Sequence, residues 1–421
     1  MKRFFYLSAF VSLLLTVLVS CGSDGEPTGP LPDPDDGFID LSAEEMANCY
    51  IVREAGSYKF KADNQFNLGE GLPVPPEIHP TDAKLVWQTE PGTITNVELA
   101  DYDGMPYIVF NVAKVHGNAL LAATNDNDEI LWSWHIWMPE ESPEAILTAT
   151  GYYVMNMNLG AGNSQPGDPL SYGLLYQWGR KDPLPAAATL TGDATTTGTP
   201  LYDIEGNPVT IVNSSWYSNS DNTLAFATAN PTTCISNYSQ FAKSRDWLKD
   251  SASDDSLWGN PEGYYRDSEN NSYPNKGRKT CYDPSPAGWM VAPPDAFRNA
   301  TFSGGYAWTF LDFNICDINH DGNLDIDDYK YGWSFPAADG SPIYFPGAAR
   351  YDGSYAMLMG SVSGYWGNYW SNSPSNSMTG GALSNLSFQT KDMNGNDMTT
   401  ISPMASGSKA DAYSIRCVKT F

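Results

Sequence analysis

Acidic side chains recur at regular intervals between residues 317 and 328, in the run Asp-Ile-Asn-His-Asp-Gly-Asn-Leu-Asp-Ile-Asp-Asp. If the first aspartate is position 1 of a twelve-residue loop, side-chain oxygens fall at positions 1, 3, 5, 9 and 12, and position 7 offers its backbone carbonyl. The expected ligands are Asp317, Asn319, Asp321, Asn323, Asp325 and Asp328. Gly322 stands at position 6, where such a loop turns sharply. Hard oxygen donors without His or Cys among them favour Ca²⁺ over zinc or copper.

The loop at 317–328 resembles the calcium loops of EF-hands, and an aspartate at position 12 is closer to the loops of dockerins and other extracellular proteins. Flanking helices are not evident in the sequence, and the loop has no second copy. We therefore expect one structural Ca²⁺ ion that rigidifies an insertion, and neither a switch nor a dockerin that binds a cohesin. The alternative is an acidic turn that holds no metal.

Catalytic signatures are missing from the sequence. It has no nucleophile elbow, no zinc-binding histidine pair and no glycine loop that would cradle a phosphate. Two carboxylates could meet in space for glycoside hydrolysis, but the sequence gives no means of choosing them. The aromatic side chains of Trp366, Tyr369 and Trp370 could stack sugars if they are exposed, although aromatic and glycine runs are more often buried strand ends. We expect no catalytic role.

The N-terminus carries an export signal. Lys2 and Arg3 precede an apolar run at 4–19 that is too short and too early for a stable membrane span. The run ends in Leu18-Val-Ser-Cys21, which looks like a bacterial lipobox. We expect residues 1–20 to be a lipoprotein signal peptide and Cys21 to become the diacylated N-terminus. A plain secretory signal with an incidental cysteine is the alternative.

Residues 21–38 are rich in Gly, Pro and Asp and are expected to form a flexible tether. The acidic stretch at 22–26 resembles the signal that sends lipoproteins of the Bacteroidetes to the outer face of the outer membrane. This predicts a protein that faces the cell exterior and meets the membrane only through its lipid anchor.

Composition narrows the choice of partner. The chain has 421 residues and a formal net charge of −26, from 49 acidic and 23 basic side chains. Such a charge argues against nucleic acid and against the anionic surface of a membrane as partners. An aromatic content of 13% argues against disorder, because there is ample apolar surface to bury. The length suits two or three domains.

Short runs of β-forming residues fill residues 39–140, with Gly, Pro, Asn and Asp between them. The runs lie at 49–52, 58–61, 85–87, 107–112, 119–123 and 130–137. Roughly seven short strands in about 95 residues suit an immunoglobulin-like β-sandwich. In the last run, Trp132 and Trp134 alternate with Ser133 and His135, so the two pairs face opposite sides of a sheet. We interpret His135 as a packed or rim-exposed residue and not as a ligand.

Five cysteines follow Cys21, at positions 49, 234, 281, 316 and 417. In an oxidising compartment we expect Cys281, in the proline-rich corner at 281–293, to pair with Cys417 in the last strand-like run. A pair between Cys234 and Cys316 follows only by elimination, and Cys49 is expected to be a small buried hydrophobe. No two cysteines lie two to four residues apart, so nothing suggests a metal–thiolate site.

Residues 141–421 contain six distinctive segments, which we call landmarks. In one of them, 172–183, Arg180 and Asp182 could pair across a turn. The landmarks lie at 158–161, 172–183, 281–293, 345–350, 364–371 and 414–417. In this order they resemble the Fibrobacter succinogenes major paralogous domain, a lipoprotein module widespread in Bacteroidetes and related to the C-type lectin-like fold. The preceding residues, with Cys49-Tyr-Ile-Val and Leu131-Trp-Ser-Trp-His-Ile-Trp, resemble the sandwich domain that often accompanies it.

The resemblance implies a β-rich, multidomain chain: an Ig-like β-sandwich at 39–140, then an α+β C-type lectin-like module at 141–421 with long loops. Some members resemble distal subunits or adhesins of cell-surface fimbriae. Sugar chelation through calcium is not expected, because Gln165-Pro-Gly167 lacks the third donor of the lectin motif and Trp366-Gly-Asn368 matches its second part poorly. Tryptophans in the polar region 184–280 either pin loops to the core or form a ligand platform.

The sequence therefore predicts a lipid-anchored binding or adhesion protein whose lectin-like module recognises a glycan or a surface protein. One alternative is a structural or tip subunit of a fimbria, which a removable strand or a groove that depends on cleavage, in residues 39–138, would favour. A second is a glycan-processing enzyme, which a cleft holding two carboxylates would favour. Fold resemblance alone does not name the ligand.

Overall fold

The computed structural model describes residues 37–214, 222–237, 245–249, 255–266, 272–296, 316–323, 326–375, 381–392, 394–402 and 405–421. The expected signal peptide, Cys21 and nearly all of the expected tether lie outside these residues. With 39% strand and 4% helix, the chain belongs to the β-rich class that its sequence predicts. From residue 38 onward, the described residues form one compact unit. Among the described residues, none of the helices is long and apolar enough to cross a bilayer.

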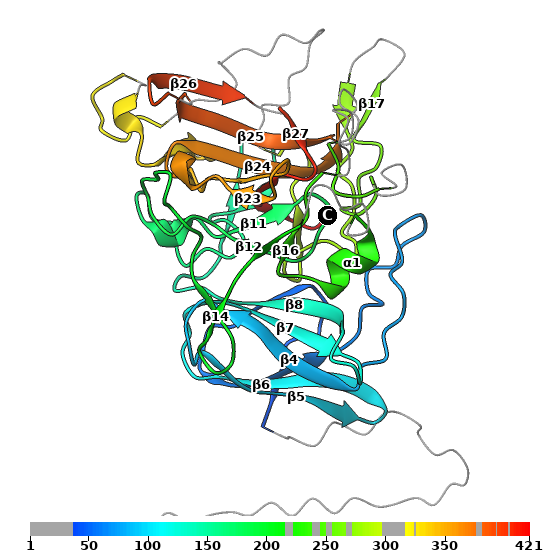
Figure 1. Ribbon diagram of the computed structural model, residues 1–421. Coiled ribbons are helices and arrows are strands. Elements are labelled where there is room, and N and C mark those ends of the chain that lie inside the picture. Colours follow the sequence, from blue (N-terminus) through cyan, green and yellow to red (C-terminus); the bar gives the residue numbers. More distant parts are fainter. Residues whose placement is uncertain are drawn as a thin grey trace, which may run out of the picture. The chain divides into compact units, whose positions relative to one another are not determined.

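Two sheets face each other in the first part of the compact unit (Figure 1). One has the strand order β1 (Ile39–Asp40), β3 (Gly56–Lys61), β6 (Met105–Val112) and β5 (Ile94–Tyr102). The other contains β4 (Asp82–Gln88), β7 (Gly117–Thr124), β8 (Ile130–Met138) and β2 (Cys49–Ile51). Phe60 and Trp134, one from each sheet, approach to 5.2 Å between ring centroids. The aromatic core between the sheets holds them together.

Strand β8 is buried on both of its faces, and its alternating sequence explains how. Trp132, Trp134 and Ile136 belong to the core between the two sheets. Trp137 points the other way, into a second core shared with residues from the rest of the chain, and its indole N–H donates to the Ala161 carbonyl at 2.7 Å. The strand is therefore the boundary between two cores: one face carries apolar and aromatic residues, and the other combines Trp137 with the buried, hydrogen-bonded side chains of Ser133 and His135.

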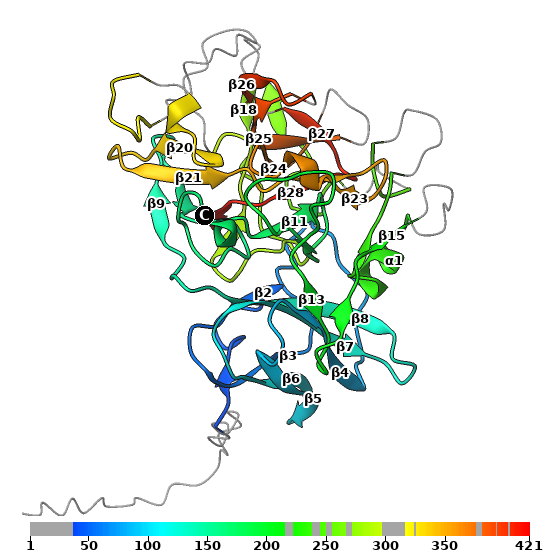
Figure 2. The same ribbon diagram turned by 60° about the vertical axis from the view of Figure 1, so that its left-hand side comes forward.

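The later part of the unit is built around one mixed sheet. Its path runs β12 (Leu184–Pro185), β11 (Leu174–Gln177), β28 (Ala412–Ser414), β24 (Trp366–Pro374), β25 (Gly381–Lys391) and β26 (Asp397–Ser402). Strands β22 (Tyr351–Asp352), β23 (Met357–Leu358) and β27 (Ser406–Ser408) attach to it. Figure 2 shows β24 and β25 at the side of the unit away from β5 and β6.

Smaller elements complete this part. They are the sheet β19 (Trp289–Val291), β29 (Cys417–Lys419), β10 (Tyr153–Met155) and β9 (Ala145–Leu147); the pairs β20 (Gly332–Pro336) with β21 (Pro342–Pro346), β15 (Val212–Asn213) with β16 (Thr233–Cys234), and β17 (Tyr264–Arg266) with β18 (Ser272–Pro274); helix α1 (Leu224–Ala229); and the 3-10 turns η1 (Pro169–Ser171), η4 (Ile326–Asp328) and η5 (Gly360–Val362). A hairpin of β13 (Leu201–Tyr202) and β14 (Pro208–Val209) adds two strands to the sheet of β4, so the later part extends the first.

The proline-rich corner and the last strand lie side by side, but the expected disulfide does not join them. Strand β19 pairs antiparallel with β29, with Val291 opposite Cys417. Cys281 lies ten residues before Val291, and its thiol donates to the Pro73 carbonyl at 3.3 Å. The Cys417 thiol contacts the Ser285 hydroxyl at 3.3 Å. All five cysteines of the described residues are free, so the predicted pairs Cys281–Cys417 and Cys234–Cys316 are both wrong for this structure.

A buried arginine joins two of the landmark segments, 158–161 and 414–417, to the neighbouring residues Met155 and Tyr344. The Arg416 guanidinium donates to the Asn158 side-chain oxygen at 2.7 Å, to the Tyr344 carbonyl at 2.7 Å and to the Met155 carbonyl at 3.2 Å. The side chain is fully buried, and this burial lowers the pKa of Arg416 to about 10. Since five N–H donors fan out from one planar group, an arginine can satisfy separated carbonyls that a lysine could not reach.

Candidate functional site

The acidic loop at 317–328 is described in part. The side chain of Asp317 accepts the Gly322 amide at 2.9 Å and the Asp321 amide at 3.2 Å. The buried carboxylate of Asp328 accepts the amides of Ile318 at 2.7 Å and Asn319 at 3.3 Å. Gly322 has a φ of +85°, which suits the sharp turn expected at position 6. The first and last expected ligands therefore close one loop.

Asp325, another expected ligand, lies outside the described residues. Among the residues that the structure does describe, no group of three or more His, Cys, Asp or Glu side chains is arranged to hold a metal ion. Asn319 and Asp321 are exposed, and Asn319 donates to Asp321 across 3.3 Å. The closed loop, the glycine turn and the oxygen donors fit a hard cation, and calcium at this loop stays a prediction.

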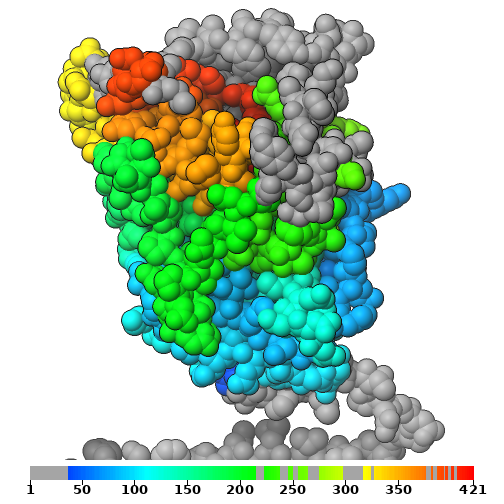
Figure 3. All heavy atoms as spheres, in the orientation of Figure 1, coloured from blue at the N-terminus to red at the C-terminus, as the bar shows by residue number. Residues whose placement is uncertain are grey.

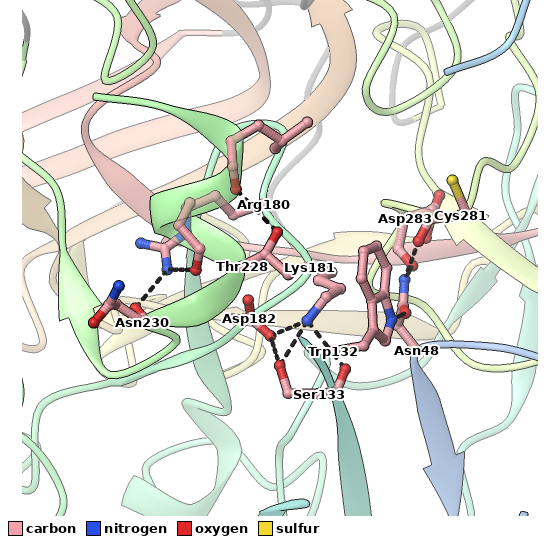
Figure 4. Close-up of polar contacts among 12 residues, drawn as sticks. Asn48, Trp132, Ser133, Arg180, Lys181, Asp182, Thr228, Asn230, Cys281 and Asp283 are labelled. Carbon is pink, nitrogen blue, oxygen red and sulfur yellow. Dashed lines mark hydrogen bonds and ion pairs between the residues drawn. The ribbon is translucent and has the colours of Figure 1, made fainter. Parts of the chain in front are cut away.

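A second cluster of charged groups lies where the run 177–182 meets strand β8, and Figure 4 shows its contacts. The Lys181 ammonium lies 2.6 Å from the Asp182 carboxylate and 2.6 Å from the Ser133 hydroxyl. The Ser133 hydroxyl also donates to Asp182 at 2.6 Å. Lys181 stands over the Trp132 ring, 4.6 Å from its centroid. Serine, lysine and aspartate in mutual contact form the kind of arrangement that a nucleophilic enzyme could use.

The environment of this cluster argues for a structural role. Ser133, Lys181 and Asp182 are 1%, 3% and 4% exposed, so no substrate reaches the hydroxyl in this conformation. Burial lowers the pKa of Lys181, while the neighbouring Asp182 carboxylate raises it. An ion pair with every partner satisfied fixes the position of two segments relative to each other, at a desolvation cost that the hydrogen bonds offset. The cluster therefore joins strand β8 to the later part of the chain.

Arg180, in the same run, also makes specific contacts inside the protein. The Arg180 guanidinium donates to the Thr233 carbonyl at 2.6 Å and to the carbonyls of Ala227 and Asn230 at the end of helix α1, at 3.3 and 3.4 Å. These last carbonyls have no partner inside the helix, and a cation there also opposes the negative end of the helix dipole. Arg180 therefore caps α1, and the ion pair predicted between Arg180 and Asp182 is replaced by the Lys181–Asp182 pair.

Asn48 makes the second polar connection between the two parts, also in Figure 4. Its amide nitrogen donates to the carbonyls of Cys281 at 2.7 Å and Asp283 at 2.9 Å. Its side-chain oxygen accepts the Trp132 indole N–H at 2.9 Å. Asn48 is 1% exposed, and all its side-chain contacts span long stretches of sequence. The segment before β2 is thus fastened to the corner at 281–293.

Nearby, burial also perturbs the charged groups of that corner. Lys279 donates to the carbonyls of Ser285 at 3.0 Å and Pro286 at 2.6 Å, and burial lowers its pKa. Burial raises the pKa of Asp283, whose carboxylate accepts the amides of Ser285 at 2.8 Å and Val291 at 2.9 Å. Opposite shifts in one site can mark an acid–base pair, but both side chains are buried and bonded to the backbone, which marks a folded corner instead.

The aromatic side chains expected to stack sugars are buried. Trp366, Tyr369 and Trp370 on β24 are 6%, 0% and 0% exposed. Each polar atom has a partner inside the protein: the Lys391 carbonyl for Trp366, the Pro346 carbonyl for Tyr369 and the Tyr176 carbonyl for Trp370. They are therefore the buried strand residues of the alternative interpretation, and the stacking platform predicted at these positions is wrong.

The region 184–280 follows the same pattern where it is described. Trp247 and Trp258 are fully buried, so they pin their loops to the core, whereas Trp216 lies outside the described residues. His135 is also packed as predicted, 1% exposed, with its Nε2 atom 2.8 Å from the Asn118 side-chain oxygen. The sequence did not reveal the contacts of Lys181 and Asn48, because their partners lie far away along the chain.

Comparison with known proteins gives no match: no protein-family model, no curated protein and no solved structure matches this chain. The function is therefore argued from sequence and geometry.

Proposed function

We propose that this chain is a lipid-anchored binding protein of the outer cell surface, which uses its later part to recognise a partner. The predicted lipobox at Cys21 and the acidic residues after it support the anchor and its outward direction. The observation that carries the binding role is that the buried charged groups serve the fold and not catalysis. Lys181, Asp182 and Arg180 all make internal contacts that join segments of the chain.

The fold assignment that accompanies this proposal is an Ig-like sandwich followed by a lectin-like module of the Fibrobacter succinogenes major paralogous type. The strand orders β1-β3-β6-β5 and β4-β7-β8 support the first half. When the strands other than β2 are lettered along the chain, these orders correspond to ABED and CFG, the strand order of an immunoglobulin constant-type sandwich, from which the chain departs in the parallel pairing of β1 with β3. The landmark segments at 158–161 and 414–417, joined through Arg416, support the second half.

The fimbrial alternative requires a strand that can leave the sandwich so that another subunit can replace it. Strand β2 is poorly suited to this. Asn48 beside it donates hydrogen bonds to the carbonyls of Cys281 and Asp283, and the backbone of Cys49 forms an isolated β-bridge with Pro286. Strand β1 has only two residues, and it pairs in parallel with β3. These contacts favour a binding protein over an assembly subunit.

The anchor and its direction can be tested in the producing cells. A fatty-acid label should enter the wild-type chain and should be absent from Cys21→Ala. Protease added to intact cells should digest the wild-type protein before the cells are lysed. A chain that takes no label, or that is digested only after lysis, would contradict the proposed location.

Binding can be tested separately with the purified chain lacking residues 1–21, on an array of printed oligosaccharides and on immobilised host matrix proteins. We expect saturable binding to at least one printed ligand. Concentration-independent signals on every spot, or none on any, would contradict the binding role whatever the location of the protein.

A further inference from the structure

We propose that Tyr331 and Tyr365, with Lys391 beside them, form a carbohydrate-binding surface next to the acidic loop. This surface, named here the Tyr331–Tyr365 surface, rests on the proposed function and gives it a site and a ligand class. Tyr331 follows η4 and the acidic loop, Tyr365 follows η5, and Lys391 ends strand β25. All three side chains are half-buried, so they present surface to solvent while the protein holds them in place.

Tyr331 has an uncommon backbone conformation. Its φ is +60°, in the left-handed region where a bulky aromatic residue is rarely found. Its carbonyl accepts the Gly347 amide at 2.7 Å, and the carbonyl of the preceding Lys330 accepts the Tyr344 hydroxyl at 2.5 Å. Conformations of this kind cost free energy and persist where the surroundings impose them, often at ligand sites. The surrounding contacts therefore hold the Tyr331 ring in place although its backbone conformation is unfavourable.

Tyr365 is held close to the first ring by a glycine. Gly364 has a φ of +78°, and a Cβ atom added to it would lie 3.0 Å from Cδ1 of Tyr331. The Tyr331 ring therefore rests on the bare backbone directly before Tyr365. The Tyr365 amide donates to Val362 at 3.0 Å, and its carbonyl accepts the Thr390 amide at 3.0 Å. Both tyrosines project from rigid backbone, which lowers the entropy that binding would cost.

Neighbouring side chains contact both tyrosine rings. The Tyr329 ring lies 6.4 Å from the Tyr331 ring and 5.2 Å from the buried Trp333 ring. The Lys391 ammonium stands 4.8 Å from the centroid of the Tyr365 ring. Figure 3 shows the yellow, orange and red segments meeting on one face of the molecule. Tyr331, Tyr365 and Lys391 are each half-buried, so an aromatic surface with an ammonium beside it is partly open to solvent.

This combination matches a sugar ring better than other ligand classes. A pyranose has an apolar C–H face that packs on an aromatic ring and an edge of hydroxyls that hydrogen-bond to phenol and ammonium groups. The chain has a net charge of −26, so an acidic peptide or a nucleic acid would be repelled over the rest of the surface. An uncharged or singly charged oligosaccharide avoids most of that repulsion. Rigid rings of this kind are also the common anchors of binding surfaces.

The test uses an array of printed oligosaccharides, followed by calorimetry with the oligosaccharide that gives the strongest signal. Tyr331→Asn keeps a residue that tolerates left-handed φ, and Tyr365→Ser removes the second ring. We expect each variant to bind that oligosaccharide at least about tenfold more weakly than the wild type. The control is Tyr355→Ser, at a tyrosine that is 72% exposed in the turn between β22 and β23. It should bind as the wild type does.

A measurement on the wild type alone covers the case in which a variant does not fold. Nitration of tyrosines should be slowed at Tyr331 and Tyr365 by the same oligosaccharide, and unchanged at Tyr355. If both folded variants bind the oligosaccharide as tightly as the wild type does, this site is overturned. The same holds if the sugar slows nitration at neither tyrosine. In both cases the proposed function still stands. A wild-type chain that binds matrix protein but no printed sugar would overturn the carbohydrate assignment alone.

Discussion

At the residue scale, His135 provides a clear dependence of stability on pH. It is 1% exposed, and burial lowers its pKa to about 3. Its Nε2 atom lies 2.8 Å from the Asn118 side-chain oxygen, and that oxygen can accept only from a ring nitrogen that carries the proton. Nδ1 is buried without a hydrogen-bond partner among the described residues, so a second proton would have none either. The native state therefore holds a neutral imidazole.

Because the folded pKa is depressed, His135 stabilises the protein above the unfolded pKa near 6.5 and loses that contribution as the pH falls. Between pH 7 and pH 5 we expect the free energy of unfolding to drop by about 2 kcal/mol from this residue. Urea unfolding at both pH values measures this drop. In His135→Gln the drop between the two pH values should be smaller than in the wild type by about 2 kcal/mol. An equal drop in the variant would contradict a buried neutral histidine.

The cysteines give a second prediction at this scale. Burial raises the pKa of Cys234, Cys281 and Cys417 to about 12, and it raises that of Cys49 as well. Burial raises the pKa of Cys316 too, but Cys316 is the one among the five described cysteines that is half-buried, so the reagent reaches it most easily. Since the thiolate is the reactive form, iodoacetamide at neutral pH should label Cys316 first in the native protein.

All five thiols should react once the chain is unfolded without a reductant. Peptide mapping by mass spectrometry counts them. A peptide pair linked through two of these cysteines would show that the exported protein carries a bridge that this structure lacks.

At the element scale, the joint between β8 and the run 177–182 rests on a buried ion pair. Lys181 and Asp182 lie 2.6 Å apart with their side chains 2% and 3% exposed. Lys84 and Asp128 also lie 2.6 Å apart, but their side chains are 34% and 74% exposed. The two pairs therefore differ in burial at equal distance. Removing one partner of a buried pair strands the other charge, whereas an exposed pair contributes little.

We expect Asp182→Asn to lower the free energy of unfolding by about 3 kcal/mol. The control Asp128→Asn keeps a residue that tolerates the φ of +62° at that position and should change stability by about 1 kcal/mol or less. Urea unfolding measures both. Equal effects of the two substitutions would show that the joint does not depend on the ion pair.

The acidic loop is the other element with a direct test. Calorimetry should detect one Ca²⁺ ion in the wild type and none in Asp321→Ala, because position 5 supplies a required oxygen. Asp339→Ala is a matched control, since Asp339 is an exposed aspartate in a turn whose carboxylate accepts the Ser341 amide and hydroxyl. The thermal midpoint should rise with added calcium in the wild type and the control only. Identical heats in all three proteins would refute the site.

The sequence predicted the elements better than it predicted their contacts. The runs at 107–112, 119–123 and 130–137 correspond to β6, β7 and β8, because alternation along a strand is a local signal. Strand β5 was missed because Asn96, with a φ of +52°, breaks the alternation at a bulge between Thr95 and Glu98. The adjacency of the 281–293 corner and the last strand is confirmed, whereas the predicted Cys281–Cys417 pair is wrong for this structure.

Contacts between distant segments account for most of the errors. No local pattern shows that Ser133 bonds to Lys181, or that Asn48 reaches the carbonyls of Cys281 and Asp283. The burial of Tyr369 and Trp370 depends on the neighbours of β24 in the sheet, which are β25 and β28. Exposure of an aromatic side chain is thus a property of the assembled sheet and not of the run that contains it.

At the scale of the whole molecule, the described residues from 38 onward form one compact unit, and this has a consequence for unfolding. Trp137 on β8 lies in the same core as Trp178 and Trp370 of the later part. The sheet of β4 gains β13 and β14 from beyond residue 200. Neither part can expose its share of this boundary without uncovering large apolar side chains, so separate unfolding of the two parts is unfavourable.

We therefore expect the whole unit to unfold in one transition, and Asn48→Ala to shift that transition without splitting it. The substitution leaves the carbonyls of Cys281 and Asp283 and the Trp132 indole without their partner, at about 1–3 kcal/mol for each buried group that stays unsatisfied. Hydrogen exchange under native conditions gives the opening free energy of amides in β7 and β8 and of amides in β24 and β28. The two sets should agree in the wild type and should fall together in Asn48→Ala. If the amides of β7 and β8 keep their protection while those of β24 and β28 lose it, the parts are independent domains and the buried contacts between them are incidental.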